Sequence, residues 1–168
     1  MLRNRNLRRS IRSHIQTVLE SASSYGMSQD YNVYDEEAMR LGETVTFPFI
    51  YLVDSAIRPT NTELPCVVLE MQITKSLFEL GNRAGRALTF FLHVFGKTRG
   101  ERDDLASMFQ DNIGQAITVY NYSSGSGVAD GTRIELDPIV PQFDVPLDKE
   151  EASLLNLTVV SYSGITTT

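Results

Sequence analysis

The chain has 168 residues, of which 42% are hydrophobic and 21% charged, and its formal net charge is −6. This length suits one domain with a sizeable core, so we expect a single domain over residues 1–168. No apolar run approaches the roughly 20 residues that cross a bilayer, and the basic N-terminus lacks the apolar stretch of a secretory signal, so we expect neither a membrane span nor a targeting segment.

Residues 2–22 are predicted to form an amphipathic helix, because apolar residues recur at steps of three or four along one face. These residues are Leu7, Ile11, Ile15, Val18 and Ala22. A second face is basic, and the first twelve residues contain no acid, so the rest of the chain is more acidic than the net charge indicates. A basic end on an acidic body binds either nucleic acid or the acidic body of a neighbouring copy. The arginines are Arg3, Arg5, Arg8, Arg9 and Arg12.

Residues 27–46 are polar and acidic and show no period, so they are predicted to form a long flexible loop. Residues 46–55 (TFPFIYLVDS) are predicted to form a strand, and Pro48 favours either an edge position or the start of the strand. The single cysteine, Cys66, excludes a disulfide within the chain and is expected to be a small buried apolar residue in a reducing compartment.

The strongest β signal is a long antiparallel hairpin. Its first strand runs from residue 66 to residue 73, and its second strand, RALTFFLHVFG, returns after the glycine-bounded turn GNRAG. Apolar and polar residues alternate in the first strand, and apolar residues recur at every second position of the second strand, which predicts one core face and one opposite face. The residues expected on the core face are Val67, Leu69, Met71 and Ile73, followed by Leu88, Phe90, Leu92 and Val94.

A second helix is predicted after the strand in ALTFFLHVFGKTRGERDDL (87–105). Thr98 and Glu101 have the spacing of a capping box, and acidic residues in the first turn complement the helix dipole. The apolar stripe of this helix comprises Leu105, Met108, Phe109, Ile113 and Ala116. The charged residues after the strand are therefore expected to be structural.

The last third of the chain is predicted to contain a flexible loop at 121–131, a short strand at 133–137, an irregular proline-rich segment, a strand at 154–162 and a polar tail at 163–168. The predicted fold class is α+β: a mainly antiparallel sheet with a long β-hairpin, packed against an N-terminal helix and a second helix.

Residues suited to catalysis are few. His14 and His93 are both expected to be structural, and no cysteine or histidine cluster has the spacing of a zinc site. A magnesium-dependent nuclease would use Asp54 and Glu70, but the position of its usual lysine holds Gln72. We therefore expect no enzymatic activity, no catalytic or metal-binding residue and no cofactor. GSGVADG (125–131) follows a helix and lacks the glycine spacing of a dinucleotide site.

The arginine cluster has three interpretations. It is a subunit contact that pairs with acids such as Asp35, Glu36 and Glu37, or the solvated side of a helix, or a non-specific site for DNA phosphates. No aromatic residue is interleaved between the arginines, so stacking of single-stranded bases is not supported. We favour the subunit contact.

The order of elements resembles that of the tail-terminator proteins of tailed bacteriophages. The resemblance rests on the N-terminal helix, the strand and long hairpin, the segment HVFGKTRGERDDLASMFQDNI and the closing strand LLNLTVVSY, and it covers most of residues 1–165. The charged junction from strand to helix is its most telling part. The long 27–46 loop and the proline-rich 138–146 segment depart from the shorter members, so another neck component, such as a stopper or adaptor, remains an alternative.

The resemblance implies a virion protein, assembled in the host cytoplasm, that forms a homo-oligomeric ring of six copies. Such a ring caps the tail tube, joins it to the head-side connector or stopper, contacts the sheath in contractile tails and lets genomic DNA pass without sequence-specific binding. It would catalyse no reaction and contact no membrane. A hairpin tip with Asn82, Arg83 and Arg86 would project toward the lumen or a neighbour. A small DNA-binding protein or nuclease is the alternative from another class.

Overall fold

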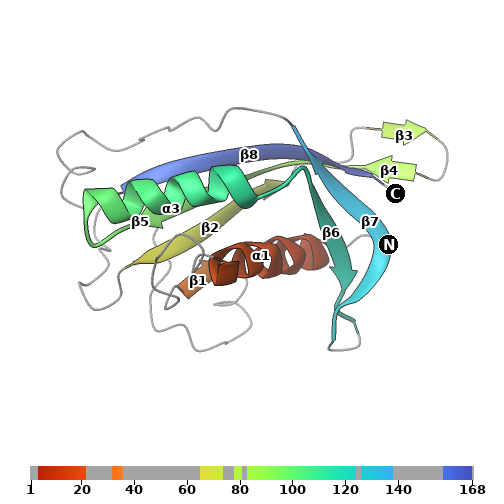
Figure 1. The fold of residues 1–168 in the computed structure, drawn as a ribbon. Coiled ribbons are helices and arrows are strands. Elements are labelled where there is room, and N and C mark those ends of the chain that lie inside the picture. The colour runs from red at the N-terminus through yellow and green to blue at the C-terminus, as the bar shows by residue number, and fades with distance from the viewer. Residues whose placement is uncertain are drawn as a thin grey trace.

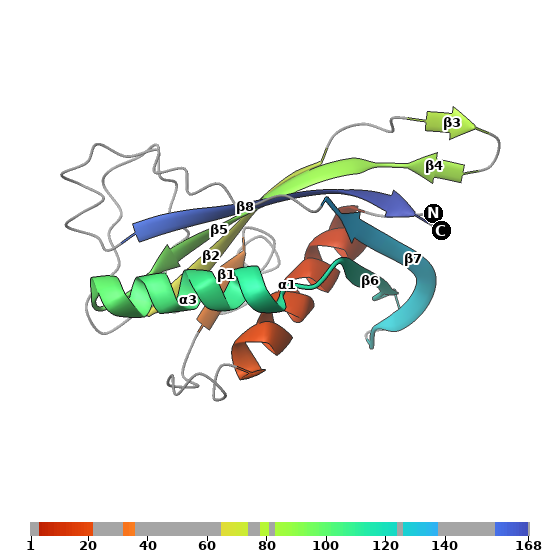
Figure 2. The same cartoon turned by 45° about the horizontal axis from the view of Figure 1, so that its top comes forward.

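The computed structural model describes residues 4–21, 32–35, 65–73, 78–80, 83–123, 126–137 and 157–167. These form an α+β fold in which two helices lie on one face of a curled, mainly antiparallel sheet (Figures 1 and 2). The strand order within the described part of the chain is β1-β2-β5-β8-β7-β6, and a separate two-stranded sheet, β3-β4, extends from one end. The predicted fold class is confirmed. The predicted strand at 46–55 lies outside the described residues.

Helix α1 (Asn4–Glu20) is the predicted amphipathic helix. Its apolar stripe is fully buried at Leu7, Ile11 and Ile15, and Val18 continues the stripe at 5% exposure. Burial of one such side chain contributes about 2 kcal/mol, so this face fixes how the helix lies on the sheet. The arginines consequently occupy the sides of the helix that the core does not use.

The predicted hairpin is formed by β2 (Cys66–Ile73) and β5 (Ala87–Phe95), which pair antiparallel from Cys66↔Phe95 to Ile73↔Leu88. Strands β3 (Phe78–Leu80) and β4 (Arg83–Gly85) continue it beyond the body of the molecule (Figure 1). The described side chains of the predicted core face do pack in the core. On the opposite face Glu70 and Gln72 are exposed, as expected, whereas Cys66 and Val68 are fully buried.

Strand β1 (Asn32–Asp35) pairs parallel with β2 at the edge of the sheet. It lies within the segment that was predicted to be a loop, so that prediction is wrong for residues 32–35. Its four residues form a strand because their backbone pairs along the edge of β2, and backbone hydrogen bonds of this kind do not require a hydrophobic pattern in the sequence.

Helix α3 (Arg99–Asn112) begins with the predicted N-cap: Thr98 Oγ1 accepts a hydrogen bond from the Glu101 N–H at 3.2 Å. The Glu101 carboxylate accepts from the N–H of Lys97 at 2.7 Å, one residue before the cap. A Cβ atom on Gly96 would lie 2.6 Å from the Arg102 nitrogen, so the strand turns into the helix without room for a side chain. The charged residues of this junction therefore cap the helix, and their structural role agrees with the expectation from the sequence.

Strand β6 (Ala116–Asn121) was not predicted. The predicted apolar stripe of the second helix continues to Ala116, but α3 ends at Asn112, and Gly114 at φ 79° reverses the chain into the strand. Ala116 is accordingly exposed on β6, while Ile117 and Val119 enter the core. The left-handed backbone at Gly114 favours glycine because a Cβ would be strained there.

Two further expectations for the end of the chain are corrected. Strand β7 (Val128–Leu136) includes part of the predicted 121–131 loop, and β8 (Leu157–Thr167) includes most of the predicted 163–168 tail. The tail is a strand because β7 pairs with it from Arg133↔Thr167 to Leu136↔Gly164. Because β8 also pairs with β5, the backbone of this segment is hydrogen-bonded on both sides. Its polar sequence gave no sign of this pairing.

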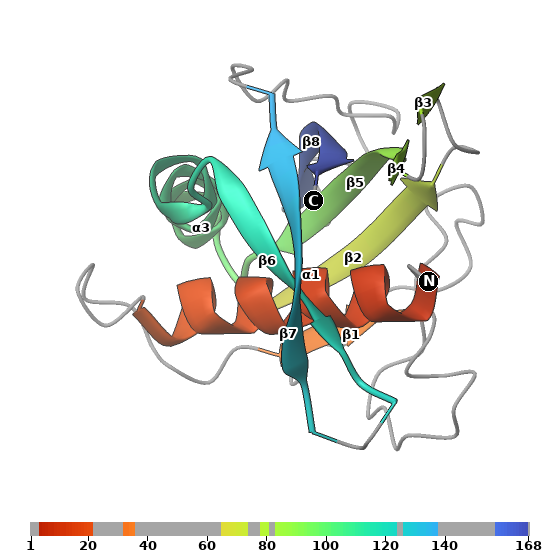
Figure 3. The ribbon, with the colours of Figure 1, turned by 90° about the vertical axis from the view of Figure 1, so that its right-hand side faces the viewer.

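Helix α1 covers the outer edge of β6. Ser10 Oγ accepts from the N–H of Tyr120 at 2.8 Å, and Asn6 Oδ1 accepts from the N–H of Tyr122 at 3.4 Å. Both side chains are almost fully buried. Figure 3 shows β6 and β7 running across α1. The edge of the sheet is thus closed by the chain itself, which prevents another strand from pairing there.

Candidate functional site

The arginine face of α1 is the candidate site. Arg5, Arg8, Arg9 and Arg12 lie at positions i, i+3, i+4 and i+7 of the helix, which places them on one face, and none of them belongs to the buried stripe. Arg5 is exposed and the other three are half-buried. Each of the four takes part in an interaction within the chain. Arg3 lies outside the described residues.

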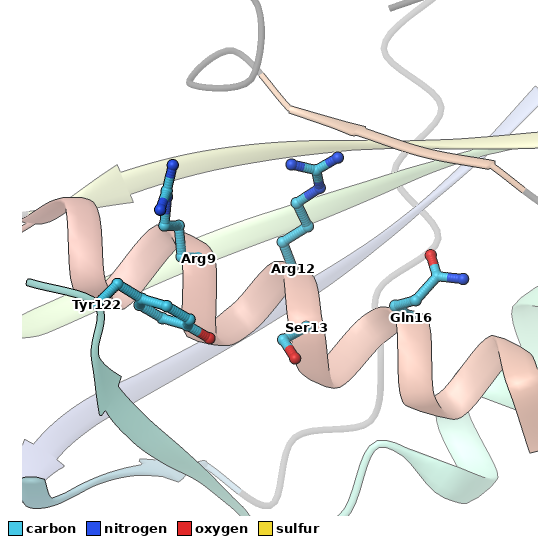
Figure 4. A pocket seen from close by; sticks show the side chains of 5 residues that line it. All are labelled: Arg9, Arg12, Ser13, Gln16 and Tyr122. Atoms are coloured by element: carbon cyan, nitrogen blue, oxygen red, sulfur yellow. The ribbon is translucent and has the colours of Figure 1, made fainter. Parts of the chain in front are cut away.

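A pocket of about 460 Å³ lies beside this face (Figure 4). Four of its lining residues come from α1, and the fifth, Tyr122, follows the end of β6. We call it the arginine pocket; it is lined by Arg9, Arg12, Ser13, Gln16 and Tyr122. Every lining side chain carries an N–H or O–H donor, and none is a carboxylate. Its chemistry suits a negatively charged oxygen group.

Tyr122 was not predicted as a site residue, because no aromatic residue is interleaved between the arginines in the sequence. The fold brings one there: Arg9 Cζ lies over the Tyr122 ring, 5.7 Å from its centroid, in a cation–π contact. A Cβ on Gly127 would lie 2.8 Å from Tyr122 Cε1, so the Gly127 backbone also lies directly against the ring. The aromatic ring is therefore held between protein groups and shapes one wall of the arginine pocket.

Helical spacing offered a signal for two of the missed residues. Ser13 and Gln16 lie four and seven positions after Arg9, which places them on the same stripe of α1. Tyr122 offered no such signal, because its place beside Arg9 depends on how β6 crosses the helix.

No family model matches this chain, and no curated protein matches it. Its function must be inferred from the residues and their arrangement.

The acids expected to meet the arginines are only partly placed. Asp35 is the last residue of β1, and Glu36 and Glu37 lie outside the described residues. The expected pairing between these acids and the arginines of a neighbouring copy therefore stays a prediction.

In the expected hairpin tip, Arg86 contacts the start of α1. Its Nη1 donates a hydrogen bond to Asn4 Oδ1, and its expected position toward a lumen or a neighbour stays a prediction. The side chain is held there because its backbone is anchored nearby: the N–H of Arg86 donates to Thr166 Oγ1 at 2.8 Å. Arg83 belongs to β4, and Asn82 lies outside the described residues.

His93 and Glu70 form a pair on the sheet face opposite the helices. His93 Nε2 donates to Glu70 Oε2 at 3.0 Å, while His93 Nδ1 is buried without a hydrogen-bond partner among the described residues. Burial lowers the pKa of His93, and the hydrogen bond and charge of Glu70 partly offset this effect. The pairing of these two residues was not predicted from the sequence.

The features required for a nuclease are not assembled in the described part of the chain. The carboxylate of Glu70 is engaged by His93, and Asp54 lies outside the described residues. No group of three or more potential metal ligands occurs among the residues that the structure describes.

His14 has a structural contact: its Nε2 donates a hydrogen bond to the Ile113 carbonyl at 2.7 Å, which joins α1 to the C-terminal end of α3. No helix in the described ranges is long and apolar enough to span a membrane.

Proposed function

We propose that this chain is a structural protein of a virion: a tail terminator, or a closely related neck protein, of a tailed bacteriophage. It acts by binding and catalyses no reaction. Six copies form a ring that closes the end of the tail tube and joins it to the head-side connector or stopper. In a contractile tail the ring also meets the sheath. A stopper or adaptor of the same neck is the nearest alternative.

The observation that carries this proposal is the arrangement of α1, the β2–β5 hairpin and α3. An amphipathic N-terminal helix, a hairpin that extends past the core and a capped helix directly after its second strand are the elements on which the resemblance to tail terminators rests. The tight junction at Gly96 gives the charged segment after β5 a structural role, which agrees with a protein whose charges serve folding and assembly.

The uneven charge supports assembly from identical copies. The chain presents two unlike surfaces: a helix with arginines on one side, and an acidic remainder. Identical copies that meet through unlike surfaces associate head to tail. A head-to-tail contact closes into a ring when its rotation divides a full turn. Polymerisation of the tube then stops, because the far face of the ring offers no copy of the tube surface. DNA passes through the lumen without sequence-specific contacts.

The test is negative-stain imaging of the full chain, alone and with tail tubes assembled from the matching tube protein. We expect rings, or tubes that carry a cap at one end only. A chain that leaves both tube ends bare would refute the terminator. Binding to the head-side connector with bare tube ends would instead indicate a stopper or adaptor.

A further inference from the structure

We infer that the arginine pocket receives an acidic stripe on helix α3 of a second copy of this chain. The acidic stripe consists of Asp104, Ser107 and Asp111, all of which are exposed. The inference rests on the proposed function, because it names the contact through which neighbouring copies in the ring meet.

The spacing of the two surfaces matches. Arg9, Arg12 and Gln16 lie at positions i, i+3 and i+7 of α1, and the acidic stripe occupies i, i+3 and i+7 of α3. At 1.5 Å per residue each row is about 10 Å long. Two parallel helices laid side by side therefore bring Arg9 to the carboxylate of Asp104 and Gln16 to that of Asp111. Arg12 then lies between the two carboxylates, opposite Ser107.

The donors suit carboxylates. A guanidinium has five N–H groups in a planar fork, so an arginine that already interacts within its own chain can still donate to a partner. The hydroxyls of Ser13 and Tyr122 and the amide of Gln16 complete a pocket in which each carboxylate oxygen meets a donor.

The arginine pocket is also formed before any partner arrives. Tyr122 is held by Arg9 on one side and by the Gly127 backbone on another, and its own N–H donates to Asn6 at 3.4 Å. A receptor whose walls are already fixed loses less conformational entropy on binding.

A second copy fits these observations better than nucleic acid does. The chain has 21 acidic residues against 15 basic ones, so its net negative charge repels the phosphates of nucleic acid. The same negative charge attracts the arginine pocket of another copy. Bases of single-stranded nucleic acid need an open aromatic face, whereas Tyr122 lies under Arg9 and against Gly127. Carboxylates need only the donors.

The experiment is a charge swap on the full chain. One variant carries Arg9→Glu and Arg12→Glu, and the other carries Asp104→Arg and Asp111→Arg. Self-association is measured by sedimentation velocity, alone and with tail tubes. We expect each variant to associate about tenfold or more weakly than the wild type. Mixing the two variants should restore association, because each acidic pocket then meets a basic stripe.

Two single reversals serve as matched controls. Glu20→Arg reverses an exposed charge at the end of α1, and Arg99→Glu does so at the start of α3. Both suit the helix dipole, so both should fold and associate as the wild type does. Circular dichroism and a thermal melt show whether the charge-swap variants fold. A further variant, Gln16→Glu, adds a carboxylate to the pocket four residues after Arg12, a spacing that supports the helix, and should also weaken association.

The outcomes separate this inference from the proposed function. Charge-swap variants that associate like the wild type, or folded variants that stay apart when mixed, would overturn the inference while tube capping could still stand. A wild-type chain that is monomeric both alone and at tube ends would also overturn the inference. The same holds if the variant with Arg9→Glu and Arg12→Glu loses DNA binding but keeps self-association, because the pocket would then bind phosphates. Swap-sensitive rings that leave every tube bare would refute the terminator function and keep the contact.

Discussion

The hydroxyl of Ser10 accepts a hydrogen bond from the backbone N–H of Tyr120 at 2.8 Å, across a sequence separation of 110 residues. The same hydroxyl donates to the Asn6 carbonyl at 2.7 Å, so one buried side chain joins the first helix to an edge strand. This contact explains why a small polar residue lies at 1% exposure beside the apolar stripe of α1.

Replacing Ser10 with alanine should lower the free energy of unfolding by about 1–3 kcal/mol, because the N–H of Tyr120 loses its acceptor in a water-poor site. Ser13→Ala is the matched control: it gains the same helix propensity on the same helix, but at an exposed position. Urea denaturation of both variants measures the difference. Equal stability of the two variants would show that the contact contributes nothing.

Alanine at Gly96 and at Gly100 should have opposite effects. At Gly96 the new methyl group meets backbone atoms of Arg102 and Thr98 at 2.6 and 2.7 Å, so the junction must shift and stability should fall by about 1–3 kcal/mol. At Gly100, in the first turn of α3, the nearest atom is 4.0 Å away, and alanine should add about 0.5–1 kcal/mol through its helix propensity. Thermal unfolding of both variants decides. A neutral Gly96→Ala would mean that the junction is looser than described.

The pair of His93 and Glu70 predicts a loss of stability in mild acid. Burial lowers the pKa of His93 below 6.5, so between 6.5 and its folded value the unfolded chain binds the proton and the folded chain does not. The free energy of unfolding should therefore decrease as the pH falls from about 7 through this window, by at most about 1.4 kcal/mol per pH unit from this one group. Below the folded pKa this contribution becomes constant.

Denaturation curves at several pH values test this assignment in two variants. His93→Gln should remove its share of the slope. Glu70→Gln should extend the slope to lower pH, because Glu70 favours the protonated imidazole. The same slope in the wild type and in His93→Gln would assign the effect to another group.

The left-handed backbone at Gly131 in β7 predicts a preference for glycine at this position. Gly131 has φ 84°, and next to it Asp130 Oδ1 accepts from the Thr132 N–H at 2.8 Å. Alanine there should cost about 1–2 kcal/mol because its Cβ strains a left-handed backbone, while asparagine, which adopts this conformation more readily, should cost less. Chemical denaturation ranks the three proteins. Equal costs for alanine and asparagine would rule out backbone strain as the cause.

The parts of the fold that were predictable have a strong local pattern. The hairpin was predictable because Leu69 and Met71 alternate with polar residues in the first strand, and Leu88 and Phe90 flank a polar residue in the second. The start of α3 was visible because Thr98 and Glu101 have cap spacing. In each case the same few residues determine both the sequence pattern and the local hydrogen bonds.

The parts that could not be predicted depend on distant partners. Residues 128–130 of β7 are all exposed, and the strand there is made by backbone pairing to β6. Nothing near Tyr122 in the sequence indicates that Arg9 will lie over its ring. The arginine face was predictable from the helix, whereas the arginine pocket exists only because β6 crosses that helix.

The contact between α1 and β6 also has a consequence for synthesis on the ribosome. Helix α1 emerges well before β6, because the strand whose edge it covers follows about a hundred residues later. Until β6 has been made, the apolar stripe of α1 lacks part of its native cover, and contacts this far apart in sequence form slowly. We therefore expect the chain to complete its fold late in translation. A nascent chain truncated before residue 116 should expose the stripe to chaperones, whereas the chain that includes β6 should cover it.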